Sequence, residues 1–226
     1  MRGIKKLSIF IATICLCQGL ALAGAVLSPV AASASLPTET TYPDCTIGKT
    51  IDQSGLVTPF ISGVTEYSSY MAGDPKHEAM YQDGCYLSEN VYFALGVKLT
   101  YDLGASYEVE HVVIWNGAVN SQNTDAGIKD AVLYFSEFED FSIATSLGVV
   151  VPQVADASIP FSAYVLDLRN TITARYIRID VSTNYGNTGH YCVSEVAFGV
   201  VPEPATVLLM GLGITGLLRK SRRLSL

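Results

Sequence analysis

The chain has 226 residues, of which 49% are hydrophobic and 15% are charged, and its net charge is −7. Between Ser35 and Val201, seven basic residues face twenty acidic ones, so this central region carries a charge of −13. A nucleic-acid binder needs Lys and Arg to displace counterions from phosphate, and so does a protein that docks on anionic lipid. The composition therefore excludes both as expected partners.

The N-terminus has the pattern of an export signal. A basic segment, Arg2–Lys6, precedes an apolar run over 7–22. The stretch Ala32–Ala34 fits the small-x-small cleavage pattern, which predicts a signal peptide over residues 1–34 with a helical apolar part. A cut after Ala23 and an uncleaved anchor are the alternatives.

The central region is typical of an all-β domain. Residues 35–44 read as a flexible segment, and the folded domain is expected over 45–199. Within 175–181, Ile177 and its alternate neighbours point to one face while Arg178 and its neighbours point to the other. Similar short runs, with no long helical periodicity, favour an antiparallel sandwich. Strands are predicted over 97–103, 109–115, 131–135, 164–168, 175–181 and 192–198.

Several ordered segments of this region resemble one known family. They read KLTYDLG at 98–104, VEHVVIWN at 109–116, GIKDAVLYFS at 127–136 and ARYIRIDV at 174–181, followed by NYGN and SEV. Together they resemble the discoidin, or coagulation-factor type C, domain. The resemblance implies a galactose-binding-like jelly-roll sandwich. It also implies a binding module whose loops at one end engage glycans, lipid headgroups or proteins.

The resemblance also implies a structural calcium ion. Glu195 matches the late Glu of the family, and Asp74 is a candidate partner. The Trp that is usual in the early segment is absent from 73–85, and two carboxylates alone fall short of the oxygens that a hard cation needs. The alternative is that both are ordinary surface carboxylates.

Three cysteines remain after removal of the leader, in a compartment where disulfides persist. They allow at most one intramolecular bridge, and neither they nor the histidines have the close spacing of a zinc site. In the fold of the resembled family, the segments that carry Cys85 and Cys192 come together. We therefore expect a Cys85–Cys192 bridge, with Cys45 left over or as the alternate partner.

Two loops, 116–125 and 183–191, together offer amides and aromatic side chains, as a sugar site requires. The alternative is that such Asn- and Gly-rich stretches simply form turns. Trp115, at a strand end, either packs in the core or stacks on a ligand. The candidate ligand-binding residues are Asn120, Asn123, Tyr185, Asn187, His190 and Trp115.

Catalytic motifs are absent from the sequence. There is no Gly-x-Ser-x-Gly elbow, no His-Glu-x-x-His and no Gly-rich phosphate loop. A glycosidase needs only two carboxylates, but Glu137, Glu139 and Asp140 follow a strand, where a solvated turn is the simpler interpretation. We expect a protein that is not an enzyme.

The C-terminus, residues 200–226, reads as a sorting tail. Pro202, Glu203 and Pro204 precede an uncharged segment over 205–218. As a helix this segment covers roughly 21 Å, which is short against a bilayer core of about 30 Å. A basic cluster follows and favours the cytoplasmic side. The cluster consists of Arg219, Lys220, Arg222 and Arg223.

This tail resembles the PEP-CTERM sorting signal of bacterial surface proteins, which the membrane enzyme exosortase is thought to process. The short span favours a transient membrane stop before processing over a permanent transmembrane anchor. The sequence therefore predicts an exported cell-surface or matrix protein whose non-catalytic domain binds extracellular polysaccharide. The alternatives are a structural coat or adhesion protein without a small ligand, and a hydrolase on the same sandwich.

Overall fold

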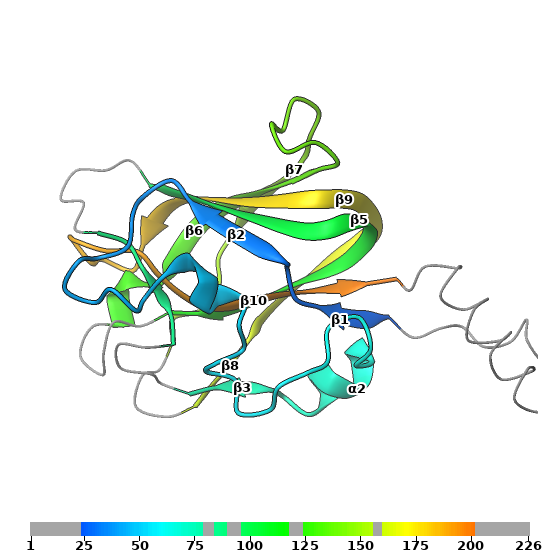
Figure 1. The fold of residues 1–226 in the computed structure, drawn as a ribbon, viewed down its shortest axis with the longest axis horizontal. Helices are drawn as coiled ribbons and strands as arrows, with labels where there is room; N and C mark the ends of the chain where they lie inside the picture. The colour runs from blue at the N-terminus through cyan, green and yellow to red at the C-terminus, as the bar shows by residue number, and fades with distance from the viewer. Residues whose placement is uncertain (1–23, 79–83, 90–95, 118–123, 156–159, 202–226) are drawn as a thin grey trace, which may run out of the picture. The chain divides into compact units, whose positions relative to one another are not determined.

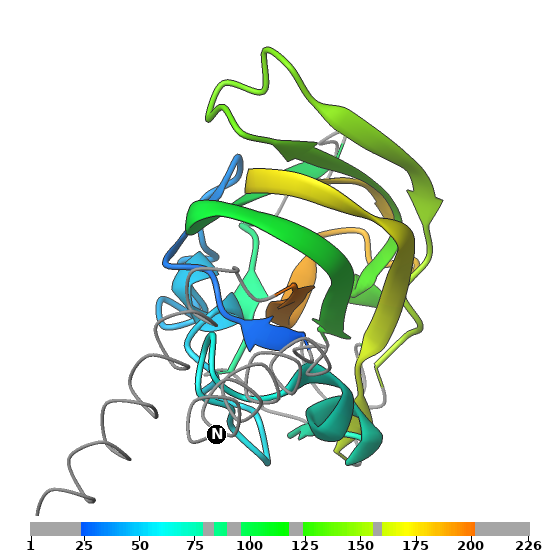
Figure 2. The same cartoon turned by 90° about the vertical axis from the view of Figure 1, so that its right-hand side faces the viewer.

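Two long antiparallel strands, β5 (Val97–Asn116) and β9 (Tyr164–Asn184), organise the fold. The computed structural model describes residues 24–78, 84–89, 96–117, 124–155 and 160–201. In Figure 2 these two strands, green and yellow, curve together around the interior. Because both strands bend, each of them borders the core on more than one side.

The remaining strands extend this pair into an eight-stranded sheet with the order β1-β10-β5-β9-β6-β7, in which β2 also pairs with β5 and β4 with β10. A separate two-stranded sheet joins β3 and β8. The predicted all-β antiparallel class is confirmed, since each of these strand pairs is antiparallel (Figure 1). The shorter strands are β1 (Ala25–Leu27), β2 (Ala31–Ala34), β3 (Lys76–His77), β4 (Tyr86–Leu87), β6 (Ile128–Ser136), β7 (Thr145–Val150), β8 (Phe161–Ser162) and β10 (Cys192–Val200).

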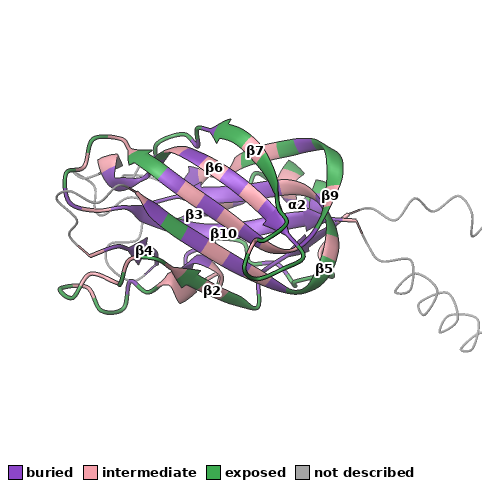
Figure 3. Ribbon diagram, turned by 90° about the horizontal axis from the view of Figure 1, so that it is seen from above, coloured by how far each residue is buried: buried purple, intermediate pink, exposed green. Residues whose placement is uncertain are grey.

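Alternating side chains build the main core, as the sequence predicts. Ile177 and Ile179 of β9 are buried, whereas Arg178 between them is half-buried. Figure 3 shows such an alternation of buried and half-buried residues as bands along β6. β10 departs from this pattern, because all nine of its residues are buried. Its alternate residues pack into two different clusters, with Phe198 in the main core and Ala197 in a second one around Trp115. A strand covered on both faces shows no polar alternation.

The structure joins strands that the sequence predicts as separate. The runs 97–103 and 109–115 form one continuous strand, β5, and its register with β9 shifts at the bend between Asp102 and Tyr107. Gly104 lies in this bend with a φ of +85°, a backbone conformation that glycine adopts without strain. The bend is mostly exposed, so its residues lack the apolar alternation that marks a strand in the sequence.

The N-terminal boundary of the folded unit differs from the predicted one. The unit runs from Gly24 to Val201, so it includes residues 24–44, which the sequence analysis divides between a leader and a flexible segment. β1 pairs with β10, and β2 pairs with β5 (Figure 1). The stretch Ala31–Ala34 is small and uncharged, so it satisfies a cleavage pattern and a sheet strand equally well.

Short helical segments complete the described part of the chain. These are two 3₁₀ turns, η1 (Ile47–Thr50) and η2 (Thr124–Ala126), and one α-helix, α2 (Tyr67–Ala72). Glu66 caps α2, because its carboxylate accepts hydrogen bonds from the backbone N–H groups of Ser68 and Ser69. None of the helices described here has the length and hydropathy needed to cross a membrane. The predicted leader helix and the predicted tail helix over 205–218 lie outside the described residues.

Candidate functional site

The loop over 183–191 uses its amide side chains to hold its own shape. Asn184 Nδ2 donates to the carbonyl oxygens of Asn187 and His190, each at 2.8 Å. Asn187 Oδ1 accepts from the N–H groups of Gly189 and His190 at 2.9 Å, while its Nδ2 donates to Asp125 Oδ1 at 3.0 Å. These are the contacts of a turn. They occupy groups of Asn187 that the sequence analysis assigns to a ligand.

The other predicted ligand residues of this region are also engaged within the protein. Tyr185 donates its hydroxyl to Pro152 O at 2.6 Å, and burial raises the pKa of this phenol. His190 Nδ1 lies 2.9 Å from Ser88 O and 3.8 Å from a Glu39 carboxylate oxygen. The role of these residues in binding stays a prediction. Asn120 and Asn123 lie outside the described residues.

Trp115 belongs to the core, which is one of the two roles that the sequence allows for it. Its side chain is fully buried, and its indole N–H donates to Pro75 O at 2.9 Å. It packs in the second cluster with residues such as Val26 and Tyr67. Its apolar area is therefore covered by the protein itself.

The two residues expected at a calcium site have different surroundings. Asp74 is exposed and pairs with Lys76, whose Nζ lies 2.6 Å from Asp74 Oδ2. Glu195 is fully buried, and its Oε2 accepts the backbone N–H of Gln53 at 3.0 Å. Its Oε1 has no hydrogen-bond partner among the described residues. Burial raises the pKa of Glu195 to about 9, with a smaller contribution from the charge of Asp52.

The described acidic side chains do not by themselves complete a calcium site at Glu195. The unpartnered oxygen of Glu195 is one donor, whereas calcium takes six to eight oxygens. Across the described ranges, no three Asp, Glu, His or Cys side chains are grouped so that they could hold a metal. Asp52, the nearby carboxylate, is already paired with Lys49 at 3.2 Å. A neutral buried carboxyl is the state that this environment favours.

The three cysteines lie together. Cys45, Cys85 and Cys192 are all buried, in one cluster with Leu87 and Ala126. Cys192 is the strand partner of Leu87, whose N–H donates to Cys45 O at 3.1 Å. The fold thus brings the three thiols into one neighbourhood, and the Cys85–Cys192 bridge stays a prediction with Cys45 as the alternate partner.

A cavity of about 290 Å³ crosses the outer face of the sheet, and we call it the sheet groove. Arg178 of β9 and its strand partner Thr100 of β5 lie in it, with the end of β2 on one side and a loop after β6 on the other. Its lining offers hydroxyls, two cationic groups, two carboxylates and one aromatic ring. The lining residues are Ser33, Ala34, Ser35, Lys98, Thr100, Glu139, Asp140, Phe141 and Arg178.

Arg178 is held in a fixed position in the sheet groove. Its guanidinium carbon lies 4.7 Å from the ring centroid of Tyr134 and 4.6 Å from that of Phe141. Its Nε and Nη2 donate to the two carboxylate oxygens of Asp180 at 2.7 and 3.3 Å. A guanidinium stacked and tethered in this way loses little further freedom when it contacts a ligand.

The loop after β6 positions Phe141 over this arginine. Ser136 Oγ donates to Ile143 O at 2.7 Å and accepts the N–H of Phe138 at 2.9 Å, so it ties the two ends of the loop together. Phe141 N–H donates to Phe138 O at 3.1 Å. Phe141 has a φ of +54°, a left-handed turn conformation that is rare for a bulky residue. The sequence shows this loop only as an acidic turn, so Phe141 is not among the predicted site residues.

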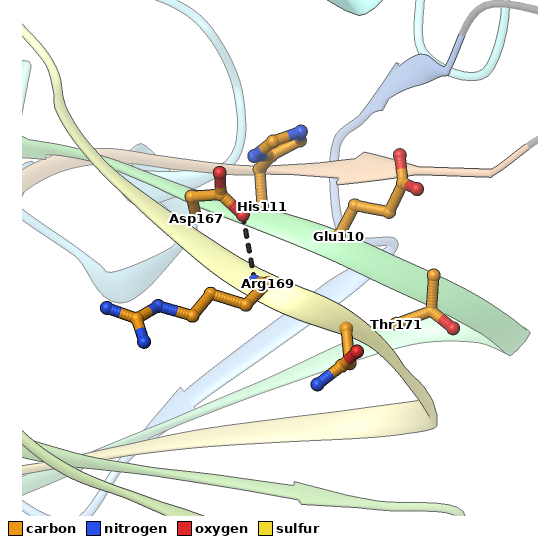
Figure 4. Close-up of a pocket in the computed structure, with 6 residues that line it drawn as sticks. Glu110, His111, Asp167, Arg169 and Thr171 are labelled. Carbon is orange, nitrogen blue, oxygen red and sulfur yellow. Dashed lines mark hydrogen bonds between the residues drawn. The ribbon is translucent and has the colours of Figure 1, made fainter.

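A second, smaller cavity of about 100 Å³ lies where β5 meets β9 (Figure 4). His111 stacks on Tyr67, with ring centroids 4.2 Å apart, and its Nδ1 is buried without a hydrogen-bond partner in the described structure. Asp167 accepts the backbone N–H of Arg169 at 2.8 Å, while the guanidinium of Arg169 points away from Glu110 and His111. We call this cavity the Glu110 pocket.

The chain is similar in structure to several solved carbohydrate-binding modules (CBMs). The family 32 CBM of NanJ from Clostridium perfringens, solved with galactose, has a TM-score of 0.48 and 14% identity over 75% of this chain and 92% of its own. Chitosan-binding module 1 from Paenibacillus sp. IK-5 has a TM-score of 0.46 and 14% identity, covering 76% of this chain and 95% of its own. The CBM32 of AlyQ, solved with 4,5-unsaturated mannuronic acid, has a TM-score of 0.45 and 18% identity over 76% and 96%.

These neighbours do not indicate which ligand this chain binds, because their identities are low. No curated protein matches the sequence.

The C-terminal tail is assigned by its sequence. Residues 200–223 match the PEP-CTERM protein-sorting motif, which confirms the predicted identity of the C-terminal signal.

Proposed function

We propose that this protein is exported, sorted by its PEP-CTERM tail through exosortase, and binds extracellular polysaccharide at the cell surface without catalysing a reaction. The observation that carries the binding proposal is the preformed sheet groove, with Arg178 fixed between two rings and Phe141 held over it by a tied loop. This location differs from the loops 116–125 and 183–191 that the sequence analysis favours.

The chemistry of the sheet groove suits a sugar chain. A saccharide presents hydroxyls, which pair with charged groups and hydroxyls, and apolar ring faces, which pack on an aromatic side chain. Lys98 and Thr100 lie along one side of Arg178, and Glu139 lies on the loop opposite. Glu195, whose pKa is raised by burial, lines neither the sheet groove nor the Glu110 pocket.

Phe141→Ala is expected to weaken polysaccharide binding by about two- to tenfold, because one aromatic contact contributes roughly 0.5–1.5 kcal/mol. Arg178→Lys should weaken binding similarly, since lysine keeps the charge but lacks the planar stacked group. Binding would be measured on a glycan array and with polysaccharide from the producing cells.

Phe138→Ala is the matched control, because Phe138 is on the same loop and exposed but does not line the sheet groove. It should bind like the unaltered protein. If Tyr185→Ala abolished binding while Phe141→Ala did not, the loop over 183–191 would be the site instead. Self-association without saturable glycan binding would favour a structural coat protein.

Deletion of Arg219–Arg223 is expected to reduce retention at the cell surface and to release protein that still carries residues 205–218. Positive charges hold the end of an apolar segment in the cytoplasm, and without them the stop before processing is lost. Surface and medium fractions would be compared by immunoblotting and mass spectrometry. Replacement of the arginines by lysine keeps the charge and should keep retention; unchanged localisation of the deleted form would count against the sorting role.

A further inference from the structure

Several stretches near the N-terminus satisfy the rule of small residues at a leader-cleavage site, and two of them bracket residues 24–34. One follows Ala23 in the stretch Ala21–Ala23, and the other follows Ala34 in the stretch Ala32–Ala34. The sequence alone does not separate them, because both offer small residues in the same spacing. The fold does separate them, since residues 24–34 lie between the two sites and belong to the folded unit.

β1 is bound on two sides by the rest of the domain. It pairs with the end of β10, where Val26 is the strand partner of Gly199. On its other side, Val26 N–H donates to Thr65 O at 2.9 Å and Val26 O accepts the N–H of Gly63 at 2.8 Å. The Val26 side chain is fully buried in the second cluster with Trp115. Loss of β1 would open this cluster and leave these backbone groups without partners.

The segment after β1 is bound as well. Ser28 N–H donates to Ser62 Oγ at 3.0 Å, and Ser28 Oγ donates to Ile51 O at 2.8 Å. Val30 N–H donates to Asp102 O at 2.8 Å, and from Ala31 onward β2 pairs with β5. Cleavage after Ala34 would remove all of these contacts, whereas cleavage after Ala23 would remove none of them.

Gly24 lies beside the end of β10 and close to Glu110. Its carbonyl accepts the N–H of Tyr67 at 2.7 Å, so its backbone is already held. A Cβ placed on Gly24 would lie 3.1 Å from Val200 O and 3.6 Å from Glu110 Oε2, so the position is narrow and faces a carboxylate. Glu110 has no ion-pair partner in the part of the chain that the structure describes.

We propose that the exporting cell's leader peptidase cuts the Ala23–Gly24 bond, and that the new α-ammonium group of Gly24 lies near the carboxylate of Glu110, which Figure 4 shows in the Glu110 pocket. Hydrolysis consumes one water molecule, leaves a carboxylate on Ala23 and creates the amine of Gly24, which takes up a proton. The nitrogen and the built Cβ are both bonded to the Cα of Gly24, so the new charge arises in the neighbourhood of this carboxylate. This inference rests on the export proposed above.

The test is the N-terminal peptide of the full chain, expressed with its own leader and recovered from the surface fraction. The first basic residue after either site is Lys49, so trypsin releases a peptide over 24–49 or one over 35–49. Mass spectrometry is expected to find the peptide over 24–49. A start at Ser35, or at any other residue, overturns the cleavage site, and so does a surface chain that retains residues 1–23. A chain that never reaches the surface fraction overturns export itself.

Matched variants separate the two sites. Ala23→Val and Ala34→Val each replace the small residue before one cut by a β-branched one, which leader peptidases reject and which a β-strand accepts. Ala23→Val should stop processing at Gly24 and accumulate the precursor, whereas Ala34→Val should leave the peptide over 24–49 unchanged. Normal processing of Ala23→Val together with blocked processing of Ala34→Val would overturn the proposal.

Discussion

A protein that begins at Ser35 is expected to lose cooperative folding, whereas one that begins at Gly24 keeps it. The missing segment contains Val26 and Leu27, both buried. Burial of each such side chain contributes roughly 1.5–3 kcal/mol, and each hydrogen bond of the segment contributes about 1 kcal/mol. Their total is comparable with the roughly 5–15 kcal/mol that stabilises a whole domain.

Urea unfolding of the two proteins, followed by circular dichroism, would measure this difference. A point variant measures how much one side chain of this strand contributes to stability. Val26→Ala should lower the free energy of unfolding by about 2–3 kcal/mol, because it removes buried methyl groups and leaves a cavity. Val30→Ala, at a position 67% exposed, should change it by less than about 0.5 kcal/mol. Equal midpoints for the Ser35 and Gly24 proteins would show that β1 is not part of the stable fold.

The stability of the folded domain is expected to fall as the pH rises from about 5 to 8, and Glu195→Gln should remove much of this fall. In the unfolded chain the carboxyl ionises above its ordinary pKa of 4.5, but in the folded protein burial raises its pKa to about 9. Between these values the folded state holds one more proton, so stability is greatest below the lower pKa and is lost toward the higher one. The slope from this group is at most about 1.4 kcal/mol per pH unit.

Urea unfolding at pH 5 and pH 8, in the presence of EDTA, would measure the slope. The unaltered protein should be less stable at pH 8, where Glu195→Gln should be the more stable of the two, because a neutral amide replaces the carboxyl. Glu78→Gln, which alters an exposed carboxyl, is the control and should keep the slope of the unaltered protein. An identical pH dependence for Glu195→Gln and the unaltered protein would mean that Glu195 is already ionised when folded.

The sequence predicts the strands better than it predicts the site. Alternation along 175–181 correctly places Arg178 on the outer face of the sheet, because a strand has a period of two whatever it pairs with. The contact that makes Arg178 a candidate binding residue is with Phe141, 37 positions earlier in the chain. No local pattern marks Phe141, since its position depends on a loop closed by Ser136 and Ile143.

For Trp115 and Asn187, the kind of side chain is compatible with two different roles, and the sequence does not decide between them. A tryptophan at a strand end can face a ligand or the core, and the second cluster around β1 covers this one. An asparagine in a Gly-rich loop can contact a sugar or close a turn, and Asn187 closes the turn with Gly189 and His190. Only the neighbours that each side chain meets in the folded protein decide between such roles.

The sequence by itself determined the all-β class and the C-terminal sorting motif, because both can be recognised from short contiguous patterns of charge and hydropathy. The tertiary structure alone decided that residues 24–34 belong to the domain, that Glu195 is buried, and that Arg178 lies beneath Phe141. Each of these depends on pairing between distant segments. Val26 pairs with Gly199, and Glu195 accepts the backbone N–H of Gln53, only after the chain has folded. No pattern of neighbouring residues therefore predicts these contacts.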